Sequence, residues 1–201
     1  CFKTLIGHSH YVSCLVKINQ SVIASGSDDQ KIIIWDIVIG KSLKTLVGHN
    51  FHVSSIIKID ENHIASGSHD NTIKIWDINS GEILKTLTGH TNQIYSLVLF
   101  ENTLLASGSY DDKIKIWDLV NKENNKILKG HTDHINKIIK ININQIASAS
   151  DDDSIRIWDL DNEENNKTLN GHTSCVYCII KINSNHIVSG GDDTIRIWNL
   201  I

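Results

Sequence analysis

The sequence predicts an all-β fold built from five copies of one unit. Two dipeptides recur in step along the chain. Gly-His begins at residues 7, 48, 89, 130 and 171, and Trp-Asp begins at residues 35, 76, 117 and 158, with Trp198-Asn199 as a last variant. Short runs rich in β-branched residues lie between these dipeptides, and they lack the 3.6-residue period of a helix. An internal period of about 41 residues is typical of a repeat architecture.

Within one repeat, four apolar runs alternate with polar turn residues. In the second repeat these runs cover residues 52–59, 64–68, 72–78 and 82–90. Gly, Asn and Asp supply the backbone angles of tight turns, so the absence of proline is no obstacle to the turns between strands. A single four-stranded sheet cannot bury both of its faces, but copies stacked radially against each other can.

Composition and charge narrow the classes of partner. Hydrophobic residues make up 40% of the 201 residues and charged residues 21%, and no apolar run is long enough for a membrane span. The net charge is −4 and Lys and Arg do not cluster, which argues against nucleic acid. Cys175 and Cys178 form a lone C-x-x-C in a strand-like run, without the second pair of a zinc ribbon. We therefore expect no metal and no cofactor, and the cysteine usage favours a reducing compartment.

The two interlocked dipeptide registers resemble the WD-repeat family of β-propellers over essentially the whole chain. The resemblance implies a single propeller domain, residues 1–201, of four-stranded antiparallel blades. Its repeats cover approximately residues 8–48, 49–89, 90–130, 131–171 and 172–201. Residues 1–7 match the fourth strand of the other repeats and are expected to complete the last blade as a ring-closing strand. The five blades then either close a ring themselves or belong to a larger ring of about seven blades, and the parent chain then carries further blades or domains.

Ser68, His69 and Asp70 stand side by side, and these are the residue types of a hydrolase triad. The resemblance implies something else: a His, a Ser, an Asp and the Trp of each repeat form a buried hydrogen-bond chain, here called a tetrad. The indole N–H can only donate, a hydroxyl can accept it and donate onward, and an imidazole can link that hydroxyl to a carboxylate. The five tetrads are His8, Ser25, Asp29, Trp35; His49, Ser66, Asp70, Trp76; His90, Ser107, Asp111, Trp117; His131, Ser148, Asp152, Trp158; and His172, Ser189, Asp192, Trp198.

The tetrad occurs five times, whereas a catalytic serine occurs once, and its serines lack the G-x-S-x-G turn that presents a nucleophile. We therefore expect no catalytic residue and no enzyme. Function is instead expected at positions that differ among the repeats. These positions flank the start of the first strand or precede the tetrad Asp, and in the family they ring the top face of the propeller. All four tyrosines of the chain fall there, and Tyr is enriched at interface hot spots. The candidates for partner binding are Tyr11, His52, His69, Gln93, Tyr95, Tyr110, His134, Asn136, Asp151 and Tyr177.

These residues predict a non-catalytic scaffold or adaptor that binds other proteins or peptides through the top face. The expected setting is intracellular, cytoplasmic or nuclear, with neither nucleic acid nor a membrane as partner. No Arg occupies the variable positions beside the first strands, which disfavours recognition of phosphorylated peptides. The alternative is a carbohydrate-binding or glycosidase site at the channel mouth. A glycosidase needs two facing carboxylates, for which this rim offers Asp28 and Asp151.

Overall fold

A computed structural model describes residues 2–100, 103–120, 126–162 and 164–200. All regular secondary structure in these residues is β-strand, so none of them belongs to a helix that could cross a membrane. The chain forms two compact units, residues 1–94 and 95–201. The predicted all-β fold of antiparallel sheets is confirmed in both units.

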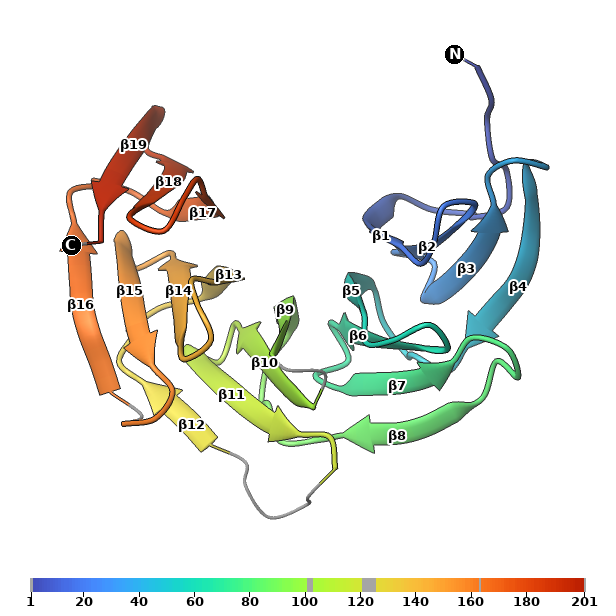
Figure 1. The fold of residues 1–201 in the computed structure, drawn as a ribbon, viewed down its shortest axis with the longest axis horizontal. Helices are drawn as coiled ribbons and strands as arrows, with labels where there is room; N and C mark the ends of the chain where they lie inside the picture. The colour runs from blue at the N-terminus through green and yellow to red at the C-terminus, as the bar shows by residue number, and fades with distance from the viewer. Residues whose placement is uncertain (1, 101–102, 121–125, 163, 201) are drawn as a thin grey trace. The chain divides into compact units, whose positions relative to one another are not determined.

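The first unit contains two four-stranded antiparallel sheets, each in simple sequence order (Figure 1). The first sheet consists of β1 (Val12–Lys17), β2 (Val22–Ser27), β3 (Lys31–Asp36) and β4 (Lys41–Val47). The second sheet consists of β5 (Val53–Lys58), β6 (His63–Ser68), β7 (Ile73–Asp77) and β8 (Ile83–Leu87). The four runs predicted for the second repeat correspond to β5, β6, β7 and β8.

The core of the first unit lies between its two sheets. Ile32 and Ile34 of β3 share one buried cluster with Val53 and Ile56 of β5. Gly26 of β2 lets this contact close, because a Cβ at this position would lie 2.7 Å from Val53 Cγ1. The stacking of neighbouring copies thus buries faces that a lone sheet would expose.

The second unit contains the remaining three sheets. The third sheet consists of β9 (Ile94–Phe100, which starts at the last residue of the first unit), β10 (Leu104–Ser109), β11 (Lys113–Asp118) and β12 (Lys126–Lys129). The fourth consists of β13 (Ile135–Lys140), β14 (Gln145–Ser150), β15 (Ser154–Asp159) and β16 (Glu164–Asn170). The last has three strands, β17 (Val176–Lys181), β18 (His186–Gly191) and β19 (Thr194–Asn199).

Residues 2–7, for which a ring-closing strand is predicted, form no strand in the structure, and Cys1 lies outside the described residues. These residues instead run along the first sheet, where Lys3 Nζ donates to the carbonyl oxygens of Ile37 and Val38. The matching segments β4 and β8 are strands because each pairs with the Trp-bearing strand of its own sheet. Closure of a ring stays a prediction.

Candidate partner-binding face

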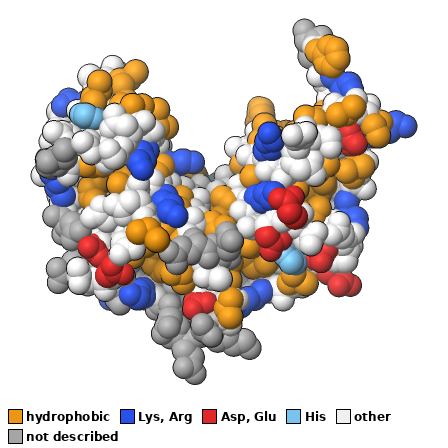
Figure 2. All heavy atoms as spheres, viewed as in Figure 1, with side chains coloured by type: hydrophobic (Ala, Val, Ile, Leu, Met, Phe, Trp, Pro, Cys, Tyr) orange, Lys and Arg blue, Asp and Glu red, His pale blue; other side chains and the backbone are white. Residues whose placement is uncertain are grey.

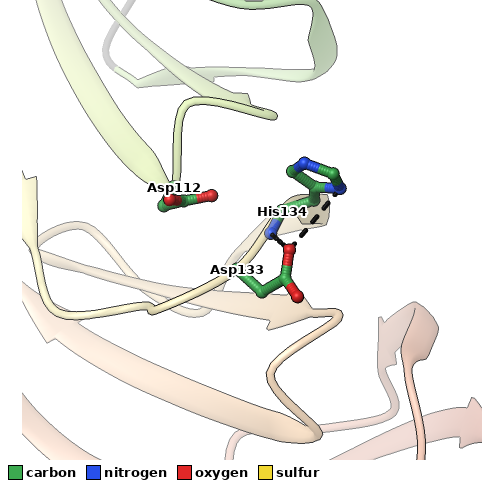
Figure 3. Close-up of side chains that lie close together, drawn as sticks. All are labelled: Asp112, Asp133 and His134. Carbon is green, nitrogen blue, oxygen red and sulfur yellow. Dashed lines mark hydrogen bonds and ion pairs between the residues drawn. The ribbon is translucent and has the colours of Figure 1, made fainter.

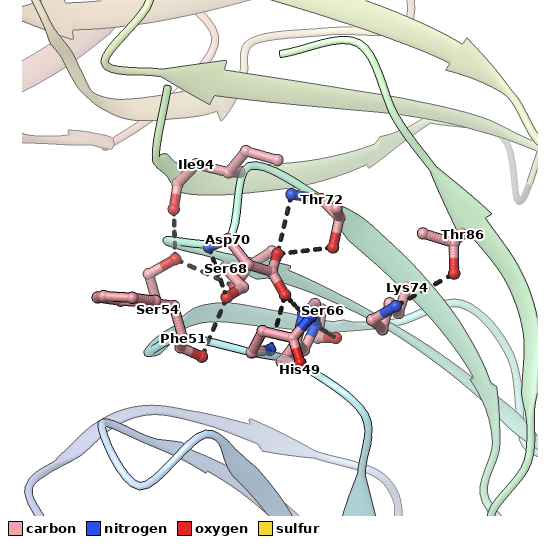
Figure 4. A network of polar contacts seen from close by, with 12 residues as sticks. His49, Phe51, Ser54, Ser66, Ser68, Asp70, Thr72, Lys74, Thr86 and Ile94 are labelled. Atoms are coloured by element: carbon pink, nitrogen blue, oxygen red, sulfur yellow. Dashed lines mark hydrogen bonds and ion pairs between the residues drawn. The ribbon is translucent and has the colours of Figure 1, made fainter. Parts of the chain in front are cut away.

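The tetrad of the second repeat forms one continuous hydrogen-bond chain, of which Figure 4 labels His49, Ser66 and Asp70. Trp76 Nε1 donates to Ser66 Oγ at 2.8 Å, Ser66 Oγ lies 2.7 Å from His49 Nε2, and His49 Nδ1 lies 2.8 Å from Asp70 Oδ2. An indole only donates and a carboxylate only accepts. Ser66 therefore donates to Nε2, and the His49 proton lies on Nδ1 and points to Asp70.

Three further tetrads have the same geometry. Their Trp Nε1–Ser Oγ distances are 2.7 Å in each, and their His Nε2–Ser Oγ distances are 2.7, 2.6 and 2.7 Å, in the sets of Trp35, Trp158 and Trp198. In each of them the other imidazole nitrogen faces the tetrad Asp. In the third set, Trp117 donates to Ser107 at 2.8 Å. The His of this set, His90, belongs to the first unit, whereas its other three residues belong to the second. The role of these residues as the structural support of the blades is an inference from this geometry.

The tetrad aspartates of three repeats are held in the ionised form. Burial opposes ionisation of Asp70, but the hydrogen bonds from His49 and Thr72 outweigh burial and hold the pKa of Asp70 well below its usual range. The same balance, with His131 and Ser154 as donors, lowers the pKa of Asp152. The pKa of Asp29 is lowered as well, because the Ser9 backbone N–H and the His8 side chain overcome its burial. The carboxylates are therefore anchored acceptors.

Ser68 is engaged in the turn that carries the tetrad Asp. Its hydroxyl donates to the carbonyl oxygen of Phe51 at 3.1 Å and accepts the N–H of Asp70 at 3.1 Å (Figure 4). The ring of His69 lies beside the ring of His52, with 5.2 Å between their centroids. Ser68 and Asp70 thus stabilise the turn, and His69 forms a ring pair at the surface.

One backbone hydrogen bond explains why the two groups of variable positions meet in space. The N–H of the residue before the tetrad Asp donates to the carbonyl of the residue directly before the first strand. This bond joins Asp28 to Tyr11 at 3.0 Å, His69 to His52 at 2.9 Å and Asp151 to His134 at 2.9 Å. Side chains from both groups therefore lie at the same end of each sheet, here called the top face of its unit.

On the top face of the first unit, Asp28 is the centre of a polar cluster. Its carboxylate accepts a hydrogen bond from Ser13 Oγ at 2.6 Å and lies 3.6 Å from His10 Nδ1 and 3.8 Å from His52 Nδ1. Tyr11 is 78% exposed and meets His10 edge to face. Burial and the neighbouring His52 lower the pKa of His69, against a smaller opposing effect of Asp28. Gln93 is half-buried directly before β9.

On the top face of the second unit, three aromatic rings form a continuous stack. The rings of Tyr95 and Tyr110 lie 4.0 Å apart at an angle of 5°, and those of Tyr110 and His134 lie 4.0 Å apart at 6°. Burial, a hydrogen bond with Tyr95 and the charge of Asp151 raise the pKa of Tyr110. The rings come from β9, from the turn between β10 and β11, and from the segment before β13, so two repeats build the stack.

Asp151 connects this stack to two further candidates. Its Oδ1 accepts a hydrogen bond from Asn136 Nδ2 at 2.6 Å, and its Oδ2 lies 3.5 Å from His134 Nδ1. Tyr177, 64% exposed, directly follows Val176, whose carbonyl oxygen accepts a hydrogen bond from Asn136 Nδ2 at 3.1 Å. The structure therefore brings together the six partner-binding candidates of the second unit, which are Tyr95, Tyr110, His134, Asn136, Asp151 and Tyr177.

Sequence reasoning missed two carboxylates at the same place. Ligand atoms of Asp112, Asp133 and His134 lie within 4.8 Å of one another (Figure 3), a spacing that could hold a cation. Asp112 directly follows a tetrad Asp and has a left-handed φ of 65°, and Asp133 directly precedes a partner-binding candidate. The sequence did offer a signal for these two carboxylates, because each is adjacent to a residue that the sequence had already singled out. The expectation of no metal site stays a prediction.

Repeated antiparallel sheets in one Gly-His and Trp-Asp register define a repeat protein of the β-propeller class. The sequence matches the family "WD domain, G-beta repeat" over residues 1–36, 40–77, 81–118, 122–159 and 163–199. The chain therefore belongs to the WD40 repeat family. Propellers of this family generally act as scaffolds for interactions between proteins and are typically not catalysts.

Two comparisons place the chain beside individual proteins. It is similar to the solved structure of U3-55K, with a TM-score of 0.88 and 31% identity over 98% of this chain and 63% of that one. It is 45% identical over 38 residues to an uncharacterized WD repeat-containing protein of Schizosaccharomyces pombe (strain 972 / ATCC 24843), a match that covers 18% of this chain and 10% of that protein. The chain thus spans less than two thirds of the length of either protein.

Proposed function

We propose that this chain is a non-catalytic scaffold or adaptor module that binds another protein or a peptide through its top-face residues. The observation that carries the proposal is that six variable residues gather in one place. Three of them form the Tyr95–Tyr110–His134 stack, and the other three lie beside it. Aromatic side chains that are partly exposed offer rigid contact area with a polar tip, which is the composition of interface hot spots. An intracellular location, cytoplasmic or nuclear, belongs to the same proposal, because WD-repeat proteins are commonly intracellular.

The tetrads support a division of roles in which they hold the sheets and the variable residues bind the partner. The tetrad side chains form hydrogen bonds with one another inside the sheets, and these bonds position the turns that carry the variable residues. In the second repeat, Asp70 accepts the N–H groups of Asn50 and Thr72, and it thereby ties the Gly-His segment to the turn. A rigid support of this kind lowers the ordering cost of binding.

The test is an affinity capture from a cell lysate with the whole 201-residue chain as bait. A Tyr95→Ala, Tyr110→Ala, Tyr177→Ala triple variant is run beside it, with folding checked by circular dichroism. The expected result is a protein that the parent chain holds and the triple variant loses. A variant with exposed strand residues replaced, Leu43→Ala and Leu84→Ala, serves as the matched control and is expected to retain capture. A partner that the Tyr variant retains would place binding elsewhere on the chain.

A further inference from the structure

We propose that the top face of the second unit recognises an arginine-bearing segment of its partner. The binding group consists of the carboxylates of Asp112, Asp133 and Asp151 and the Tyr95–Tyr110–His134 stack, and it is called here the acidic aromatic platform. This inference rests on the proposed function and specifies the chemistry of the partner.

The first argument is an unbalanced charge. Asp133 Oδ1 lies 3.6 Å and Asp151 Oδ2 lies 3.5 Å from His134 Nδ1, and Asp112 completes the group (Figure 3). None of the three carboxylates pairs with Lys or Arg among the residues that the structure describes. Three like charges this close repel each other, and a cation from outside would relieve that repulsion.

The second argument is that the top-face segments of the unit, all of them described by the structure, contain neither Lys nor Arg that could balance this group. The top-face segments of the unit are residues 110–112, 130–136, 151–153, 171–177 and 191–193, and they contain eight Asp and neither Lys nor Arg. Lys113 and Arg196 stand at the edges of these segments. Lys113 Nζ donates to the Asp111 carbonyl at 3.0 Å, and Arg196 Nη2 lies 3.3 Å from Asp192. On the face drawn in Figure 2, Lys or Arg side chains and Asp or Glu side chains both occur.

The third argument is the nature of the neighbouring surface. The side chains of Asp133, His134 and Asp151 are 52%, 38% and 18% exposed, so the carboxylates can be reached from solvent beside the ring stack. A guanidinium is planar, stacks on aromatic rings and bonds a carboxylate through two N–H groups at once. An ammonium is more strongly hydrated and lacks this planar fork. Aromatic rings beside carboxylates therefore favour Arg over Lys.

The experiment uses the whole chain and a short fluorescent peptide of alternating Gly and Arg. Counterparts in which Lys or Glu replaces Arg are measured in parallel by fluorescence anisotropy, at low and high salt. We expect affinity in the order Arg, Lys, Glu, with Arg binding weakened by salt. The variant Asp112→Asn, Asp133→Asn, Asp151→Asn should weaken Arg-peptide binding by about tenfold or more.

The matched control removes three negative charges elsewhere, by Glu61→Gln, Glu82→Gln and Asp161→Asn. Asp161 follows β15 whereas Asp151 precedes it, so the two lie at opposite ends of this strand. Binding should change by less than about twofold in the control. Should the triple Asn variant fail to fold, Asp112→Asn alone keeps the test, because Asn tolerates a left-handed φ, and it should still weaken binding several-fold.

Equal binding of the Arg and Glu peptides, or equal losses in the test and control variants, would overturn the inference. Binding of Zn²⁺ to the chain without any binding of the Arg peptide would overturn it as well. When the lysate capture succeeds and depends on the tyrosines but the Arg peptide does not bind, only this inference fails. When both experiments are negative, the proposed function fails with it.

Discussion

The indole N–H of Trp76 donates to the hydroxyl of Ser66 at 2.8 Å, and both side chains are buried. Replacing Ser66 by Ala strands two buried polar groups, the indole N–H and His49 Nε2. We expect a loss of about 1–3 kcal/mol in the free energy of unfolding, the usual cost of unsatisfied buried groups. Urea denaturation followed by Trp fluorescence measures this change.

Ser42→Ala is the matched control for that variant. Ser42 lies exposed on β4, and its replacement should alter the free energy of unfolding by less than about 0.5 kcal/mol. Similar effects of the two Ser→Ala variants would show that the tetrad of the second repeat contributes little to stability.

Gly48 packs closely against side chains of the neighbouring strands. A Cβ at Gly48 would lie 2.6 Å from Ile83 Cδ1 and 3.0 Å from Trp76 Cη2, so Gly48→Ala should cost about 1–3 kcal/mol through overpacking. A double-mutant cycle with Ile83→Val tests the cause, because Val lacks the Cδ1 atom that lies nearest. The penalty of Gly48→Ala should be smaller in the Val background, and an additive cycle would contradict the steric explanation.

Stability is expected to fall in acid because the tetrad aspartates have lowered pKa values in the folded chain. Below the ordinary pKa of 3.8 the unfolded chain binds more protons than the folded chain. The contribution is therefore fully present above that pH and is lost as the pH falls through the folded pKa values. Denaturation curves at a series of acidic pH values should show this loss. The free energy of unfolding should change less steeply with pH in the Asp70→Asn variant than in the parent chain. An unchanged slope in that variant would remove Asp70 from the explanation.

The last repeat has a tighter turn than the others, and its backbone is strained. Gly191 pairs with Thr194, so Asp192 and Asp193 form a two-residue hairpin turn with φ values of 44° and 61°. Gly adopts such angles without steric cost, so Asp193→Gly should stabilise the chain by up to about 1 kcal/mol. Thermal unfolding measures the gain. Ser184→Gly, at an exposed position without positive φ, is the control and should be neutral or destabilising, whereas a gain of equal size there would contradict the argument.

Most of the sheet structure could be predicted because its signals are local. Turn residues and β-branched runs repeat with the dipeptides, so β5 to β8 follow from the second repeat alone. Residues 2–7 show the limit of this reasoning, because their sequence matches that of β8 but they form no strand in the structure. In the last repeat, Ser189 and Asp192 stand one residue closer together than the Ser and Asp of the other tetrads. This deletion is visible in the sequence, whereas the positive φ values of Asp192 and Asp193 are not.

The sequence by itself determined the repeat and the fold class, and its resemblance to the family predicted the members of each tetrad. It could do so because strands paired in a regular register bring residues at constant spacings together, as Ser66 and Trp76 show. Only the tertiary structure decided that Tyr95, Tyr110 and His134 stack and that Asp112, Asp133 and Asp151 gather beside them. These contacts join side chains of two repeats, and they depend on how neighbouring sheets pack and on side-chain rotamers, which a sequence period does not specify.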